Sequence, residues 1–132
     1  MNESLNVRKV TQSKPIVFVV DDEYVIASTL ATILKQSGFE ATSFADPLEA
    51  LDAAKLNSPD LLISDVMMPQ MTGVDLAIQL QQLAPQCRIL LFSGQAATAD
   101  LLQKARIEGH DFTLLSKPVH PTDLLSALRA LK

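Results

Sequence analysis

The chain has 132 residues, a length that fits one domain. Hydrophobic residues make up 48% of it and charged residues 20%, a balance typical of globular rather than disordered proteins. The net charge of −4 and the scattered basic residues argue against direct binding of nucleic acid, which requires clustered lysine and arginine side chains.

The single cysteine, Cys87, excludes an intramolecular disulfide and is typical of a reducing compartment. The longest apolar run, Ile16–Val20, is far too short to span a bilayer, and residues 1–14 lack the apolar segment of a signal peptide. We therefore expect a cytoplasmic protein without membrane insertion. Residues 1–14 are expected to form a flexible arm before one domain at residues 15–132.

Apolar runs and amphipathic stretches alternate along this domain. Short runs rich in apolar and β-branched side chains predict five strands, at Ile16–Val20, Ala41–Phe44, Leu61–Ser64, Arg88–Phe92 and Phe112–Leu115. Apolar spacing and capping residues predict five helices, at Glu23–Gln36, Pro47–Leu56, Val74–Leu83, Ala96–Arg106 and from Pro121 onward. This alternation predicts an α/β fold with a parallel sheet that helices cover on both faces.

Polar or charged side chains follow four of the predicted strands. Asp21 and Asp22 follow the first strand, Asp65 the third, Ser93 the fourth and Lys117 the fifth. Because the carboxyl ends of parallel strands meet at one edge of the sheet, where ligands bind, we expect these side chains to converge there. Three carboxylates and one ammonium group would then share one site.

Such a site has the parts needed to form an aspartyl phosphate. Clustered carboxylates repel one another, and Mg²⁺ relieves this repulsion because it takes carboxylate and phosphate oxygens as ligands. A carboxylate can also act as a nucleophile. During phosphoryl transfer, Mg²⁺ could neutralise one phosphoryl oxygen, Lys117 could meet a second, and the Ser93 hydroxyl could donate a hydrogen bond to a third.

Five short segments carry a family resemblance through their order and spacing: Val19–Glu23, Ser64–Asp65, Met68–Gly73, Phe92–Gly94 and Lys117–Pro118. With these segments, the sequence resembles the receiver domain of two-component response regulators over most of its length. The resemblance implies a flavodoxin-like (βα)5 fold, a three-layer sandwich whose five parallel strands have the order 2-1-3-4-5.

The same resemblance implies roles for individual residues. Asp65 is the phosphoacceptor, and Mg²⁺ is held by Asp65, Asp21 and Asp22, most directly by Asp22, with the backbone carbonyl of Met67 as a further ligand. The domain would accept its phosphoryl group from a histidine kinase or a histidine phosphotransfer protein. It would then change conformation and signal to a partner protein, so it is expected to be a signalling protein rather than an enzyme.

The resemblance also implies a conformational switch and a cis peptide bond. By the resemblance, Ser93 is the switch hydroxyl, Lys117 contacts the phosphoryl group, and the Lys117–Pro118 peptide bond is cis. Many receivers carry an aromatic residue three positions before the lysine, but here that residue is Leu114. No output domain follows Lys132 in this sequence, so we expect a single-domain response regulator.

Three other readings compete with this one. A flavin-binding protein of the same topology would need free N–H groups for a phosphate after the first strand, where Asp21 and Asp22 would repel the phosphate. A phosphatase with an aspartate nucleophile commonly has a second acid two residues later, and Met67 occupies that position. A receiver-shaped scaffold that binds a partner without phosphorylation stays open as an alternative.

Overall fold

Five parallel strands form one sheet, in the spatial order β2-β1-β3-β4-β5. The computed structural model describes residues 14–94 and 98–131. The strands are β1 (Ile16–Val20), β2 (Glu40–Phe44), β3 (Leu61–Asp65), β4 (Arg88–Ser93) and β5 (Thr113–Ser116). The helices are α2 (Tyr24–Gln36), α3 (Pro47–Leu56), α4 (Gly73–Leu83), α5 (Thr98–Ile107) and α6 (Pro121–Ala130).

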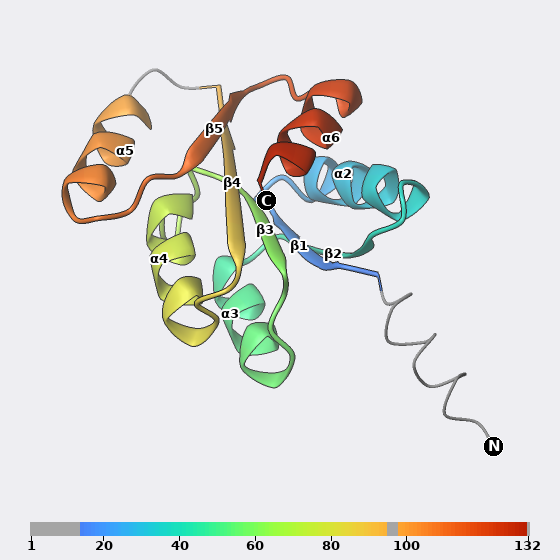
Figure 1. The fold of residues 1–132 in the computed structure, drawn as a ribbon, viewed down its shortest axis with the longest axis horizontal. Coiled ribbons are helices and arrows are strands. Elements are labelled where there is room, and N and C mark those ends of the chain that lie inside the picture. Colours follow the sequence, from blue (N-terminus) through green and yellow to red (C-terminus); the bar gives the residue numbers. More distant parts are fainter. Residues whose placement is uncertain (1–13, 95–97, 132) are drawn as a thin grey trace.

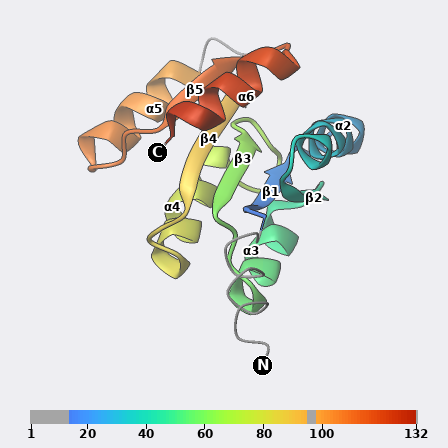
Figure 2. The same cartoon turned by 45° about the vertical axis from the view of Figure 1, so that its right-hand side comes forward.

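Helices cover both faces of the sheet. Figures 1 and 2 show α2 and α6 on one face, and α3, α4 and α5 on the other. Each strand is followed by a helix, so the chain crosses from strand to parallel strand through the helical layers. The strand order and the three layers confirm the predicted flavodoxin-like fold.

Two apolar clusters hold the three layers together. Neighbouring residues of a strand point to opposite faces of the sheet, so Leu62 of β3 joins the cluster under α3 and α4. Ile63, the next residue, joins the cluster under α2 and α6. All five residues of β3 are buried, which places Asp65 at the end of the most enclosed part of the sheet.

The element bounds differ from the predictions by one or two residues. The second strand begins at Glu40 rather than Ala41, because β1 pairs with it from Ile16 onward. The fifth strand is Thr113–Ser116 rather than Phe112–Leu115, because its register against β4 begins at Thr113. The first of these corrections extends the edge strand β2, and the second shifts the other edge strand, β5, by a single residue.

Helix starts depend on local caps. Helix α4 starts at Gly73 rather than Val74, and the Thr72 side chain caps it by accepting a hydrogen bond from the Asp75 backbone N–H.

The predicted start of the fourth helix at Ala96 falls outside the described residues. The expected flexible arm, residues 1–14, also lies outside them except for Lys14. Within the described ranges, no helix has the length and apolar content to cross a membrane.

Candidate functional site

Three carboxylates meet at the carboxyl ends of β1 and β3. Asp21 follows the last residue of β1, Asp22 comes next, and Asp65 is the last residue of β3. Each of the three offers one carboxylate oxygen that lies within 4.8 Å of the other two. Asp21 and Asp65 are buried, whereas Asp22 is exposed to solvent. The pairing of β1 with β3 explains why these residues meet, although they are far apart in sequence.

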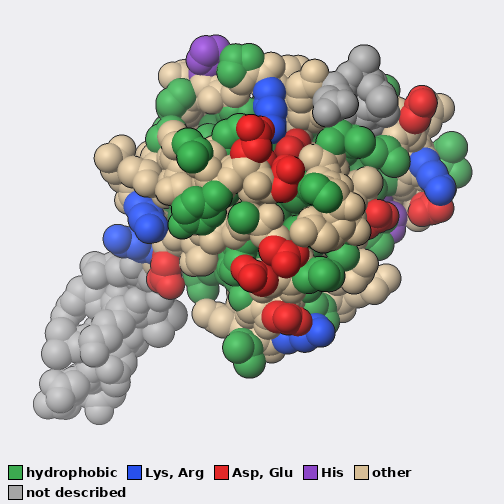
Figure 3. All heavy atoms as spheres, turned by 180° about the vertical axis from the view of Figure 1, so that it is seen from behind, with side chains coloured by type: hydrophobic (Ala, Val, Ile, Leu, Met, Phe, Trp, Pro, Cys, Tyr) green, Lys and Arg blue, Asp and Glu red, His purple; other side chains and the backbone are tan. Residues whose placement is uncertain are grey.

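Lys117 joins this group from the end of β5. Its Nζ atom lies 3.2 Å from Asp21 Oδ2 and 3.3 Å from Asp65 Oδ2. The Lys117 backbone N–H donates a hydrogen bond to the carbonyl of Ser93, and the Lys117–Pro118 peptide bond is cis. The ring of Phe92 lies under the ammonium, 5.2 Å from Nζ to the ring centroid. On the face shown in Figure 3, acidic side chains gather close to a basic side chain.

Burial sets the charge balance of the site. It raises the pKa of the Asp65 carboxyl, and the ammonium of Lys117 offsets only part of that rise. It likewise raises the pKa of Asp21, where the negative charge of Asp65 adds to the effect. Burial alone would lower the pKa of Lys117, but the carboxylates of Asp65 and Asp21 together raise it. The cluster combines three carboxylates with the one ammonium of Lys117, so the lysine cannot balance all three when they are ionised.

Backbone groups orient the two buried carboxylates. The N–H of Glu23 donates a 2.9 Å hydrogen bond to Asp21 Oδ1, and the backbone N–H of Met67 lowers the pKa of the Asp65 carboxyl. Donors aimed at a carboxylate oxygen favour its charged form. The loop after β1 thus holds the Asp21 side chain, and the loop after β3 favours the charged form of Asp65.

The three carboxylates fit a divalent cation. Mg²⁺ prefers oxygen ligands and usually binds one or two carboxylates together with water and phosphate oxygens. The set of Asp21, Asp22 and Asp65 offers carboxylate oxygens at suitable separations, and its excess negative charge favours a cation. The exposed side chain of Asp22 leaves the cluster open to solvent on one side.

A family model for the response regulator receiver domain matches residues 17–129, which include every site residue described above. The chain belongs to this receiver family. This match confirms the family assignment made from the sequence. Receiver domains are the signal-accepting parts of two-component systems.

Relatives of known name support the same assignment. Over 115 residues the receiver is 34% identical to the transcriptional regulatory protein CreB of Escherichia coli, covering 87% of this chain and 49% of CreB. It is 36% identical to the transcriptional regulatory protein PdtaR of Mycobacterium tuberculosis, covering 85% of this chain and 54% of PdtaR. The chain therefore spans about half the length of the curated relatives it matches.

Solved structures are similar over the whole domain. The chemotaxis protein CheY4 of Vibrio cholerae has 30% sequence identity and a TM-score of 0.79, with 91% of this chain and 100% of that chain covered. A receiver domain protein of Clostridium thermocellum has 28% identity and a TM-score of 0.78, with 89% of this chain and 93% of that chain covered. The receiver fold thus accounts for nearly all of the described residues.

The predicted switch residues lie in different surroundings. Ser93 is buried at the end of β4. In the parallel pairing of β4 with β5 it lies opposite Ser116. Leu114 lies on β5, pairs with Leu91 of β4, and has 37% of its surface exposed. Phe112, two residues earlier, packs partly against the core and stacks on His110.

Two contributors to the site carried no predicted role. Ser64 is fully buried, and its hydroxyl donates a 2.9 Å hydrogen bond to the Asp65 carbonyl. Gly73 approaches the same oxygen so closely that a Cβ atom there would lie 2.2 Å from it. Both residues belong to segments that carry the family resemblance, but only the fold brings them together.

Proposed function

We propose that Asp65 accepts a phosphoryl group in a Mg²⁺-dependent reaction and that the modified receiver signals to a partner protein. The observation that best supports this is the position of the Lys117 ammonium, 3.3 Å from the Asp65 carboxylate and 3.2 Å from that of Asp21. Phosphoryl transfer depends mainly on positioning and charge neutralisation, and a nucleophilic carboxylate beside a fixed cation supplies both.

In this reaction, an oxygen of Asp65 forms a bond to phosphorus while the bond between phosphorus and the donor breaks. The donor leaves with the electron pair. Lys117 stabilises negative charge on the phosphoryl oxygens. Asp21, Asp22, Asp65 and the Met67 carbonyl would hold Mg²⁺, which when bound would supply further charge neutralisation. The receiver acts only on itself, so it is a phosphoacceptor rather than an enzyme with a separate substrate.

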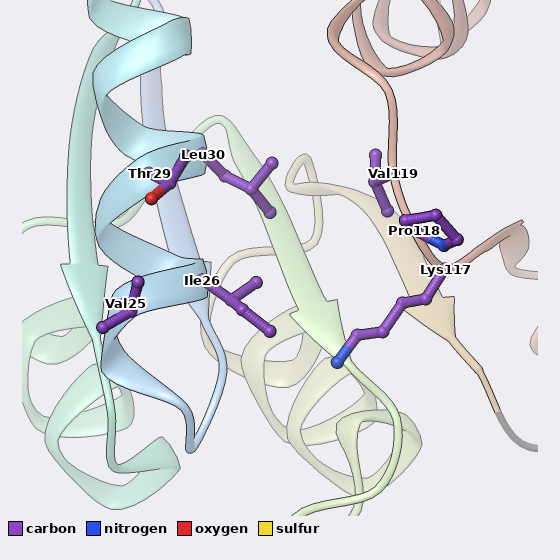
Figure 4. A pocket seen from close by; sticks show the side chains of 7 residues that line it. All are labelled: Val25, Ile26, Thr29, Leu30, Lys117, Pro118 and Val119. Atoms are coloured by element: carbon purple, nitrogen blue, oxygen red, sulfur yellow. The ribbon is translucent and has the colours of Figure 1, made fainter.

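A histidine kinase or histidine phosphotransfer protein is the proposed donor, and an apolar groove beside Lys117 suits its docking. The groove has a volume of about 240 Å³ and is lined by Val25, Ile26, Thr29, Leu30, Lys117, Pro118 and Val119. Figure 4 shows Leu30 pointing from α2 across the groove toward Val119, and Ile26 pointing toward the end of the Lys117 side chain. Apolar donor side chains could pack there while a phosphohistidine reaches Asp65.

We place this exchange in the cytoplasm, in keeping with the single cysteine of the sequence. The downstream partner is proposed to be a protein, and we expect neither direct nucleic-acid binding nor membrane insertion by the receiver itself.

Ser93 is the proposed switch. Its hydroxyl would turn toward the phosphoryl group and draw in the segment that leads through α5 to Arg106, while Leu114 repacks modestly. Backbone NMR shifts with and without beryllium fluoride, a phosphoryl mimic, test this. We expect the largest shifts between Ser93 and Arg106. Largest shifts around Leu114, with that segment unchanged, would contradict the proposed switch.

Intact-mass measurement after incubation with acetyl phosphate and Mg²⁺ tests the acceptor. Wild type should gain one phosphoryl group, and Asp65→Asn should gain none. Asp52→Asn is a matched control, because it makes the same change on an exposed side chain of α3. Removal of Mg²⁺ with a chelator should stop labelling of the wild type.

Two outcomes would count against the proposal. Equal labelling of wild type and Asp65→Asn would exclude Asp65 as the acceptor. Absence of labelling in wild type, from acetyl phosphate and from a phosphorylated histidine kinase alike, would favour the alternative of a receiver-shaped scaffold that binds its partner without phosphorylation.

A further inference from the structure

The buried hydroxyl of Ser64 lies next to the acceptor in β3 and contacts its backbone. Ser64 is fully buried, and its Oγ donates a hydrogen bond of 2.9 Å to the carbonyl oxygen of Asp65. The residue pairing of β1 with β3 ends at Val20 and Ser64, so Asp65 lies just beyond it. The Ser64 hydroxyl therefore donates a hydrogen bond to the Asp65 carbonyl at the point where the pairing of β1 with β3 stops. Because a buried carbonyl without a partner is costly, this hydrogen bond has an energetic role.

The first residue of α4 closes over the same carbonyl. A Cβ atom at Gly73 would lie 2.2 Å from the Asp65 oxygen and 3.0 Å from Ser64 Oγ. The Gly73 backbone N–H also donates a 2.8 Å hydrogen bond to the carbonyl of Val66. The hydroxyl, the carbonyl and the helix start thus form one close junction, which holds both ends of the loop between β3 and α4.

That loop in turn orients the acceptor side chain. The Met67 backbone N–H interacts with the Asp65 carboxylate and favours its charged form, and Met67 lies only two residues beyond the peptide unit that Ser64 holds. A rotation of the Asp65 peptide plane would move this N–H relative to the carboxylate it contacts. The position of the Asp65 oxygens toward Lys117 would change with it.

We propose that Ser64 is a positioning residue for Asp65: its hydroxyl fixes the Asp65 peptide unit and, through the Met67 N–H, the direction of the carboxylate. This inference rests on the proposed role of Asp65 as acceptor. Ser64 touches neither the donor nor the transferred group, so its effect is indirect. Groups that orient a reacting or metal-binding side chain typically change activity by roughly ten- to a hundredfold when they are removed.

The chain offers a matched control at Ser58. Its hydroxyl also donates to a backbone carbonyl, that of Ala54, at 3.0 Å and in a partly buried position. This hydrogen bond lies at the end of α3, before β3 begins, and does not involve the acceptor loop. Ser58→Ala and Ser64→Ala therefore remove the same kind of hydrogen bond, and only the second is next to Asp65.

The test compares Ser64→Ala, Ser64→Thr and Ser58→Ala in the full chain. Labelling by acetyl phosphate is followed at saturating Mg²⁺, and the amide ¹⁵N shifts and hydrogen exchange of Met67 and Gly73 are measured without metal. We expect Ser64→Ala to label roughly tenfold more slowly, with shifted and faster-exchanging Met67 and Gly73 amides. Ser64→Thr keeps the donor and should recover most of the rate, and Ser58→Ala should match wild type.

A wild-type labelling rate in Ser64→Ala would overturn the inference. So would a slow Ser64→Ala variant whose Met67 amide is unchanged, because the effect would then not act through the loop. These results are distinct from failure of the proposed function, in which wild type itself is not labelled. In that event the metal-free amide measurements still decide whether Ser64 holds the loop.

Discussion

Strands β3 and β5 each bring one charged side chain to the site, but the two strands are held very differently. All five residues of β3 are buried, and strands pair with it on both sides. β5 is an edge strand, and three of its four residues are exposed. The side chain of Asp65 is correspondingly 8% exposed and that of Lys117 23%. Asp65 is thus fixed in the core, while Lys117 follows the most exposed strand of the sheet.

If Asp65 is phosphorylated as proposed, this difference predicts which part of the receiver responds. Regions with few buried apolar contacts open and rearrange at lower free-energy cost than core strands. Movement of α5, with modest repacking on β5, would leave the carboxylate cluster intact, because Asp65 ends β3 and Asp21 directly follows β1, which pairs with β3. Under the proposed function, we therefore expect the carboxylates and the moving elements to lie in two regions, which meet where the Lys117 N–H contacts Ser93.

The largest expected effect comes from shortening one leucine in each strand. Leu62 of β3 is fully buried, whereas Leu114 of β5 is 37% exposed. Leu62→Ala should lower the free energy of unfolding by about 3 kcal/mol, because a cavity forms in the core. Leu114→Ala should cost about 1 kcal/mol or less, because solvent already reaches the side chain. Urea unfolding of both variants would measure this, and equal losses would mean that β5 is as firmly packed as β3.

A second pair of variants compares two glycines near the site: Gly73, which begins α4 after β3, and Gly94, which directly follows β4. In Gly73→Ala the new Cβ would lie 2.2 Å from the Asp65 carbonyl oxygen, so backbone must move. In Gly94→Ala its nearest neighbour would be Lys117 Cβ at 3.5 Å, an ordinary contact. Gly73→Ala should cost about 2 kcal/mol of stability, as overpacked sites do, and slow the labelling of Asp65. Gly94→Ala should stay within about 0.5 kcal/mol of wild type.

Thermal unfolding and acetyl phosphate labelling, run side by side on the two glycine variants, would check this. If Gly73→Ala were as stable and as reactive as wild type, the junction between β3 and α4 would be more adaptable than its distances indicate.

Much of this arrangement could be predicted from the sequence because strand ends and parallel topology are local signals. The run Ile16–Val20 reads as a buried strand without knowledge of its neighbours, and the acidic pair that follows it must then lie at the sheet edge. Once the strand order is known, Asp65 and Lys117 converge with that pair by geometry alone. The bounds of β5 were less predictable, because pairing with β4 determines them.

The contacts that orient the acceptor could not be predicted in this way. The role of Ser64 depends on where the pairing between β1 and β3 stops, which no local pattern reveals. The role of Gly73 depends on how closely α4 approaches β3. The hydrophobic side chain of Leu114 would suggest burial. It is partly exposed because β5 is an edge strand with mostly exposed residues.

The smallest expected effect concerns how ionisation of the acidic cluster changes the free energy of unfolding. The pKa of Asp21 is raised in the folded chain, mainly by burial. Its stabilising contribution is therefore complete below the ordinary carboxyl pKa of 3.8 and is lost as the pH rises through the raised value. At neutral pH the ionised carboxylate weakens the folded state. Asp21→Asn should thus raise the free energy of unfolding at pH 7 by about 1 kcal/mol, a typical size for one substitution.

The pH dependence and the response to Mg²⁺ distinguish this cause from a simple gain in packing. The advantage of Asp21→Asn should shrink as the pH falls and vanish below 3.8, where both side chains are neutral. Asp111→Asn is the control, because its exposed pair with Arg106 should contribute less than about 0.5 kcal/mol. Mg²⁺ should stabilise wild type against urea and leave Asp21→Asn nearly unchanged, since a ligand stabilises only the state that binds it. An advantage of Asp21→Asn that persists at low pH would show that charge in the cluster does not limit the stability of the acceptor region.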